Sequence, residues 1–501
     1  MKKTIVIVLI LSLIGKGLGF LRDILITNTV GFNFETDALF LALSLTTIIF
    51  SIFSTSIRTT FAPIFSENII ENPSVAINDY RNLKRFILFI AFITSVIVFV
   101  FSEWILKVFA LGLDTETFNL SNKFLKTLSV LVFLYAYFSI TIGFLQAARI
   151  YRTAETAIII NNFVIVLFIL LFYEKLGIWS ILLGFILGAV TQVILANYIL
   201  LKKVPKPIEH TAHKANKEKI LKFLNMSKYV LFGSVVAQLT LIADKSVASF
   251  LEEGSITALH YSSLLRNLPL NIIILVVTNV LFTNLSLYYK KDKSMFYGLI
   301  EKQLNYLSFM ISPFIVFFLL YSEDLVDMLY NRGSFTENGV DMISSALVAY
   351  SAGMLFWVIK EVFNKVCYAA GNTKLPLITA LVSLLINVAL NVFLGIFMGL
   401  GHVGIALATS ISILINASLT LIYLIKKNII ATHRNTIIIS CKALVNLLII
   451  LSIAYIYKEY GYEYNSQTVE IILGFIIISL ITLIMSRFMG INLKIYKRGK
   501  K

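Results

Sequence analysis

The sequence is poor in charged residues and has almost no cysteine. Only 14% of its 501 residues are Asp, Glu, Lys or Arg, whereas 58% are hydrophobic. Because soluble proteins have about 25% charged residues, this composition excludes ordinary soluble domains and indicates a polytopic membrane protein. Cys367 and Cys441, the two cysteines, both lie in apolar runs. They form no disulfide framework or metal-binding spacing, and we expect them to be small buried hydrophobic residues.

Enzyme motifs are also missing. The chain has no nucleotide-binding glycine loop, no His-Glu-x-x-His and no nucleophile elbow. Its outer loops are too short for the catalytic domain of a membrane glycosyl polymerase. The net charge is +16, but the basic residues fall at the ends of apolar runs. Membrane topology and anionic lipid headgroups explain this charge better than a nucleic acid partner.

Fourteen apolar segments are long enough to span a bilayer, and no alternating β-barrel pattern is present. Basic and acidic loops alternate between them, which predicts that both termini are cytoplasmic. The run after Met1-Lys2-Lys3 contains Lys16 and Arg22 and is expected to be a retained first span rather than a signal peptide. The expected spans are 4–29, 37–66, 84–109, 120–148, 154–173, 178–201, 220–251, 256–289, 296–321, 339–370, 375–398, 402–425, 436–457 and 468–489.

The two halves of the chain resemble each other at an offset of about 220 residues, as in the pairs Asp23 and Asp244 or Gly177 and Gly401. Six spans per repeat give two parallel repeats, an arrangement typical of transporters with a central cavity. We therefore expect an all-α polytopic membrane protein with two six-helix lobes and two extra helices. The expected domains are 1–203 (first lobe), 204–219 (cytoplasmic linker), 220–427 (second lobe), and 428–501 (two extra spans and a basic tail).

Charged residues at membrane depth are the candidate site residues, because charge there is kept where it faces a polar cavity or a partner. Arg22 and Asp23 follow three glycines and Lys16, which favours a cavity-facing site over a simple interfacial ion pair. Asp37 is either a helix cap or a functional acid. Arg58 either reaches the cytoplasmic headgroups or lines the cavity, and Arg266 precedes Pro269, where a kink is expected.

Polar residues in the second half suggest further contacts. Glu361 and Lys365 are four residues apart and are expected to pair along one helix. Asn387 and Asn391 are also four apart, and hydrogen bonding between helices is their default explanation. Together with the carboxylate of Asp244, their side-chain oxygens would suit a monovalent cation such as Na⁺. A cavity with several cationic groups accommodates an anionic substrate in transit.

Short motifs in this order resemble the lipid II flippase (MurJ/MviN) family of the multidrug/oligosaccharidyl-lipid/polysaccharide exporter superfamily. The resemblance covers most of the chain. The residues that carry it include Gly-Phe-Leu-Arg-Asp at 19–23, Thr-Asp-Ala at 36–38, Phe-Ala-Pro-Ile at 61–64, Ala-Ser-Phe-Leu at 248–251, Arg-Gly-Ser-Phe at 332–335, Ala-Tyr-Ser at 349–351 and Tyr-Ala-Ala-Gly-Asn-Thr-Lys at 368–374.

The resemblance implies a flippase that moves an undecaprenyl-diphosphate-linked cell-wall precursor across the bacterial inner membrane by alternating access. It assigns the diphosphate to Arg22, with Asp23 beside it, and it matches Asp37 to a family acid. The other two family arginine positions appear here as Phe50 or Ser51 and as Leu264, so Arg58 and Arg266 are displaced candidates. The extra spans would hold the polyprenyl tail, and Asp244, Asn387 and Asn391 resemble a sodium site.

Three functions remain open at this point. The first is flipping of lipid II, and the second is flipping of another lipid-linked oligosaccharide for capsule, O-antigen or teichoic-type polymers. The third is a drug or cation antiporter, which would favour acids over arginines in its cavity. No cofactor is expected apart from a coupling ion, Na⁺ or H⁺, or the membrane potential. We expect a monomer in the lipid bilayer, with contacts to the cell-wall synthesis machinery.

Overall fold

The computed structural model divides the chain into two compact units, which are described separately. The first consists of Met1–Ile256 with Arg332–Thr336, and the second of Thr257–Asn331 with Glu337–Lys501. The structure describes residues 2–65, 69, 73–204, 221, 223, 235–236, 238–333, 337–372, 374–430, 433–460 and 466–488. All of the predicted linker at 204–219 except its first residue, and most of the basic tail, therefore lie outside the described residues.

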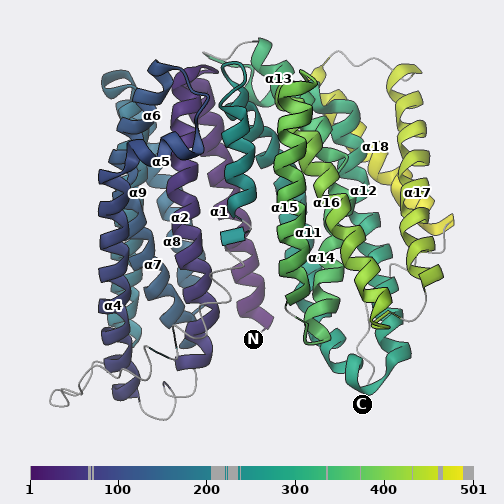
Figure 1. Ribbon diagram of the computed structural model, residues 1–501, viewed down its shortest axis with the longest axis horizontal. Coiled ribbons are helices and arrows are strands. Elements are labelled where there is room, and N and C mark those ends of the chain that lie inside the picture. Colours follow the sequence, from purple (N-terminus) through teal and green to yellow (C-terminus); the bar gives the residue numbers. More distant parts are fainter. Residues whose placement is uncertain are drawn as a thin grey trace. The chain divides into compact units, whose positions relative to one another are not determined.

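The first unit is a bundle of long helices that follow the predicted apolar runs (Figure 1). In it α1 packs on α8, α2 on α6 and α7, and α8 on α9. A further helical stretch, residues 238–248, belongs to the same unit. The helices are α1 (Lys2–Val30), α2 (Phe34–Phe65), α4 (Pro73–Val100), α5 (Ser102–Phe109), α6 (Thr115–Leu128), α7 (Val130–Ala147), α8 (Arg152–Leu176) and α9 (Ile178–Lys203).

The second unit is also helical, and it contains a π-helix, η1, that continues directly from α15. Here α12 packs on α13, α14, α17 and α18, and α16 packs on α13, α14, α15 and η1. The elements are α11 (Ser255–Lys291), α12 (Lys293–Tyr330), α13 (Glu337–Ser351), α14 (Met354–Ala369), α15 (Lys374–Leu390), η1 (Asn391–Phe397), α16 (Gly401–Lys426), α17 (His433–Tyr460) and α18 (Gln467–Phe488).

The all-α polytopic fold is confirmed. Within the described residues, ten helices are long and apolar enough to cross a membrane, or eleven if α13 and α14 count as one span. These two helices meet at 43°, so the predicted span 339–370 consists of a bent pair of helices. The number fourteen and the two six-helix repeats stay predictions, because much of the predicted seventh span lies outside the described residues.

Helix starts are fixed by polar side chains that accept hydrogen bonds from free backbone N–H groups. At α2 the Asn33 side chain accepts from the N–H groups of Glu35 and Thr36, at 3.0 and 3.2 Å. At α6 Asp114 accepts from Glu116 and Thr117, at 2.9 and 3.0 Å. These caps therefore fix the residue at which each of the two helices begins.

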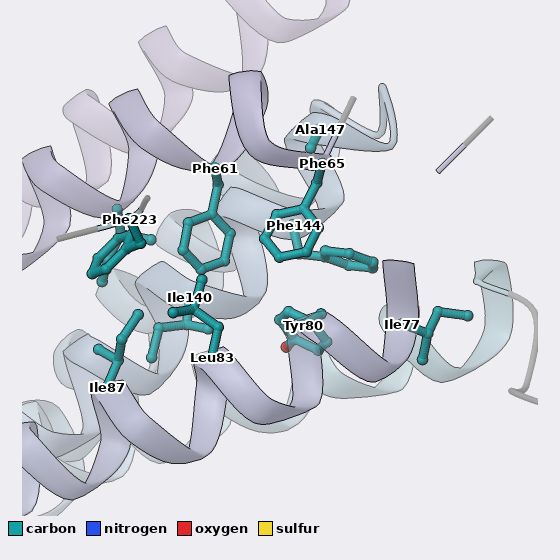
Figure 2. Packing of buried hydrophobic residues seen from close by; sticks show 11 residues of the cluster. Phe61, Phe65, Ile77, Tyr80, Leu83, Ile87, Ile140, Phe144, Ala147 and Phe223 are labelled. Carbon is teal, nitrogen blue, oxygen red and sulfur yellow. The ribbon is translucent and has the colours of Figure 1, made fainter. Parts of the chain in front are cut away.

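One end of the first unit has a buried aromatic core (Figure 2). Phe61 and Phe65 of α2 face Tyr80 of α4 and Phe144 of α7, and the rings of Tyr80 and Phe144 stack with centroids 4.2 Å apart. Such aromatic pairs add about 0.5–1.5 kcal/mol beyond area burial. This core joins α2, α4 and α7 into a rigid support for the polar residues elsewhere in the unit.

Candidate functional site

Arg22 and Asp23 form an ion pair inside the helix bundle of the first unit. Nε and Nη2 of Arg22 both donate to Oδ1 of Asp23, at 2.9 and 2.7 Å. The two side chains are only 20% and 5% exposed, respectively. The predicted pairing of these neighbours is thus present, and the pair lies on α1 where that helix packs on α8.

Two other helices hold the Arg22 guanidinium in place. Nη1 donates to Oδ1 of Asn162 on α8 at 3.1 Å, and the guanidinium carbon lies 5.1 Å from the centre of the Phe185 ring on α9. Within the described residues, three of the five N–H groups of Arg22 are used, which leaves one on each terminal nitrogen. Two such N–H groups can bind a phosphate or carboxylate in a bidentate manner.

The glycines before Arg22 allow α1 to approach α8 closely. Nδ2 of Asn162 donates to the carbonyl of Gly15 at 3.0 Å, and a Cβ on Gly19 would lie 3.3 Å from the same Nδ2. A larger residue at 19 would therefore displace Asn162 and, with it, Arg22. Lys16 is half-buried on the same helix, but in the described part of the chain it makes no hydrogen bond or ion pair.

Asp37 is not the N-terminal cap of α2, which was one of the two roles expected for it. Asn33 is the cap, and Oδ2 of Asp37 accepts from the backbone N–H of Gly254 at 2.7 Å. Gly254 has a φ of +88°, and a Cβ there would lie 2.1 Å from Cε1 of Phe32. Asp37 therefore ties the start of α2 to the turn before α11.

Lys245 is a cation next to Asp37 that sequence reasoning did not include among the site residues. Its Nζ donates to the carbonyl of Phe40 at 3.1 Å and to Oγ of Ser44, both on α2. Asp37 and Asp244 both attract its ammonium group electrostatically. The sequence signal was the pair Asp244-Lys245 within an apolar run, of which only the acid was selected.

A cavity of about 330 Å³ lies at this end of the first unit. Its walls come from the start of α2, the loop before α6 and the stretch 248–256, and neither Arg22 nor Lys16 lines it. Its acidic lining residues are Asp37, Asp114, Glu116, Glu252 and Glu253. The negative charge of these side chains would repel a diphosphate.

Arg266 lies in the second unit and is held there by local contacts. Its Nε and Nη2 donate to Oδ1 of Asn267 at 3.3 and 3.2 Å, and its guanidinium carbon lies 4.4 Å from the centre of the Tyr350 ring on α13. The side chain of Arg58 on α2 lies outside the described residues. The structure therefore does not describe Arg22, Arg58 and Arg266 together.

Glu361 on α14 forms an ion pair with its neighbour Lys360, and its expected pair with Lys365 stays a prediction. Nζ of Lys360 lies 3.1 Å from Oε1 of Glu361 and 5.2 Å from the centre of the Trp357 ring. Adjacent side chains on a helix diverge, but a long flexible lysine can fold back to its neighbour. Lys360 and Glu361 therefore neutralise each other on α14.

Asn387 and Asn391 are fully buried and bonded to each other, as their spacing predicts. Nδ2 of Asn391 donates to Oδ1 of Asn387, and Nδ2 of Asn387 donates to Oγ1 of Thr409 on α16, each at 3.3 Å. Asn391 is also the first residue of the π-helix η1. These neutral oxygens suit Na⁺, but the carboxylate of Asp244 belongs to the first unit. The described residues hold no group of three His, Cys, Asp or Glu side chains suited to a metal.

An all-helical chain with at least ten apolar spans and partly buried ion pairs is a multi-pass membrane protein in class. A solved multidrug resistance MATE transporter of the MOP superfamily, in an inward-facing conformation, has the same fold: the TM-score is 0.73 at 12% identity, over 85% of this chain and 98% of that one. The family model described as "Lipid II flippase MurJ" matches residues 26–473. The chain belongs to this MurJ family, whose members are transporters rather than enzymes.

Individual relatives agree with this assignment. A probable lipid II flippase MurJ of Aquifex aeolicus is 26% identical over 83% of this chain and 81% of that protein. One from Buchnera aphidicola subsp. Acyrthosiphon pisum is 24% identical over 98% of both. A solved structure described as lipid II flippase MurJ in an inward closed conformation has a TM-score of 0.80 at 24% identity, over 97% of this chain and 98% of that one.

Proposed function

We propose that this chain is a flippase that moves lipid II, an undecaprenyl-diphosphate-linked cell-wall precursor, from the inner to the outer leaflet by alternating access. Family membership over residues 26–473 supports the substrate class. The protein is proposed to act as a monomer in the bacterial inner membrane with both termini in the cytoplasm. Contacts with the cell-wall synthesis machinery are part of the same proposal.

The observation that carries the proposal is the orientation of Arg22. Its hydrogen bonds to Asp23 and Asn162 occupy one N–H on each terminal nitrogen and leave the other for a ligand. A planar guanidinium held this way matches the oxygens of a diphosphate better than a flexible lysine does. Asp23 lowers the net charge of the pair, so the diphosphate can be released after transport.

Flipping of another lipid-linked oligosaccharide is the second candidate. Arg266 is two residues from the family's arginine position, now Leu264, and it interacts with Asn267 and Tyr350. A displaced second cation suits a headgroup of different size. A drug or cation antiporter is a weaker candidate, because the partly buried guanidinium of Arg22 disfavours cationic substrates.

Ion coupling through Na⁺ is proposed for Asn387 and Asn391, and H⁺ is the alternative. Asp244, the predicted charged ligand, lies in the first unit and stays a prediction. Thr409 would be a further oxygen ligand, since Asn387 donates to it. Bound there, Na⁺ would supply the free energy of its gradient. The side chains themselves hold α15, η1 and α16 together in either case.

Complementation of a strain depleted of its lipid II flippase tests the proposal. The wild-type chain should restore growth, and Arg22→Ala should abolish rescue at equal protein level in the membrane. Arg22→Lys, which keeps the charge but not the planar fork, should rescue only weakly. Failure of the well-expressed wild-type chain would favour a different polysaccharide precursor, and full rescue by Arg22→Ala would remove Arg22 from the mechanism.

A further inference from the structure

A small polar cavity lies between α12 and α17 in the second unit, away from all the site residues described above. Its volume is about 30 Å³, close to the space of one water molecule. Five of its seven lining residues are polar, although both helices are apolar spans. The lining consists of Asn305, Ser308, Phe309, Ser312, Lys442, Ala443 and Asn446.

Asn446 gives this cavity an unsatisfied hydrogen-bond acceptor. The residue is 3% exposed, and its Oδ1 has no partner among the described residues. A buried acceptor without a donor costs about 1–3 kcal/mol. In a bilayer, where bulk water is absent, the missing donor must come from a bound molecule with an O–H or N–H group.

Lys442 adds a positive charge on the same wall. It is four residues before Asn446 on α17, so both side chains lie on one helix face. The lysine is exposed, and the described residues offer it no ion pair. It lies about 14 Å along the helix from His433, within reach of the headgroup layer at the basic end of α17.

α17 is placed to meet lipid. It packs on α12 and α18, lies at the edge of the second unit in Figure 1, and has only 17% of its spanning segment buried. We propose that the cavity binds the headgroup of a hydroxyl-bearing anionic phospholipid. The phosphate lies against Lys442, and a headgroup hydroxyl enters the cavity and donates to Oδ1 of Asn446.

Size decides between a phosphate and a hydroxyl inside the cavity. About 30 Å³ holds one hydroxyl or water but not a phosphate group. The ligand must therefore combine a hydroxyl with an anion a few bonds away, as phosphatidylglycerol does. A lipid-linked diphosphate sugar shares this chemistry, so the experiment must separate the two sources.

Native mass spectrometry of the purified full chain tests the proposal with phosphatidylglycerol and with phosphatidylethanol, which has equal charge but no headgroup hydroxyl. The wild-type chain should prefer phosphatidylglycerol. Lys442→Gln should weaken binding of both lipids about fivefold, the effect of one lysine near a membrane surface. Asn446→Leu should abolish only the preference, and the control Lys427→Gln, an exposed lysine outside the cavity, should change neither.

Three results would overturn the proposal. Equal binding of the two lipids by the wild-type chain, or binding that neither variant changes, would mean that a single water fills the cavity. Displacement of phosphatidylglycerol by an undecaprenyl-diphosphate-linked sugar, dependent on Lys442, would assign the site to the transported lipid. Thermal unfolding of each variant shows whether it is folded. We expect Asn446→Leu to stay folded, because it replaces an unsatisfied acceptor by an apolar group.

Discussion

The Arg22 guanidinium reaches its orientation through side chains of three helices. Asp23 on α1 and Asn162 on α8 accept its hydrogen bonds, and Phe185 on α9 lies under it. A free arginine side chain samples many conformations about its rotatable bonds, whereas these contacts restrict Arg22 to few of them. Its ordering is therefore completed before a substrate arrives, which favours tight binding of a planar anion.

Asn162→Leu should reduce transport about tenfold or more while the protein stays folded. The change removes the hydrogen bond to Arg22 and the one to the Gly15 carbonyl. A hydrogen bond to a charged group contributes about 1.5–3 kcal/mol. A flipping assay that measures lipid II exposed on the outer leaflet checks this, with membrane protein level measured in parallel.

Gln192→Leu is the matched control for this prediction. Gln192 is also a buried amide of the first unit, on α9, but its Oε1 has no partner among the described residues. Its replacement should leave transport unchanged and the protein equally stable or more so. Equal losses in both variants would mean that Asn162 serves packing rather than Arg22.

Sequence alone predicted the pair of Arg22 and Asp23 but not its surroundings. Adjacent charges in an apolar run are visible in one sequence, and the glycines before them indicate close helix packing. The contact with Asn162 joins residues 140 apart, and no local pattern reports such a distance. Lys245 was missed for the same reason, because its partners Phe40 and Ser44 lie on another helix.

At the scale of helices, caps define where the spans begin. Asp114→Ala should destabilise the protein by about 1 kcal/mol, because two N–H groups at the start of α6 lose their acceptor. Asp114→Asn keeps an acceptor oxygen and should cost much less. Thermal unfolding in detergent measures both, and equal unfolding temperatures for the two variants would argue against a capping role.

Asp292, the cap of α12, should make stability depend on pH. Hydrogen bonds from Ser294, by both its hydroxyl and its N–H, and from the N–H of Met295 lower the pKa of Asp292 below its ordinary value. Its contribution is therefore complete above the pKa of an unfolded aspartate, about 4, and is lost as the pH falls through the lower folded pKa.

The measurement is unfolding of wild type and Asp292→Asn between pH 6 and 3. The difference in unfolding temperature between the two chains should shrink as the pH falls below about 4, because the wild-type carboxylate becomes protonated. A difference that stays constant over this range would show that the carboxylate charge does not contribute to the cap.

The periodicity and length of the apolar runs predicted where helices lie better than they predicted where helices bend. The predicted limits 178–201 and 402–425 lie within three residues of α9 and α16. The bend between α13 and α14 was missed, since it falls at Ala352-Gly353 within one continuous apolar run. A Cβ at Gly353 would lie 2.6 Å from Oγ of Ser410, so this bend depends on contact with α16.

For the whole molecule, the alternation of loop charge predicts which ends face the cytoplasm. In a background with Cys367 and Cys441 replaced by Ala, Glu116→Cys should react with a membrane-impermeant maleimide in intact cells. Lys293→Cys should react only after the membrane is opened. Both positions are exposed, so access is decided by the membrane. The opposite pattern would contradict the predicted cytoplasmic location of both termini.

The π-helix η1 has a consequence for comparing this chain with its relatives. Hydrogen bonds there run from each residue to the fifth one before it, so each hydrogen-bonded ring encloses one more residue than in an α-helix. A homologue with an unbroken α-helix would be one residue shorter between Asn391 and Phe397. Alignments should therefore open a gap inside this segment, or every equivalence read from them up to Gly401 shifts by one position.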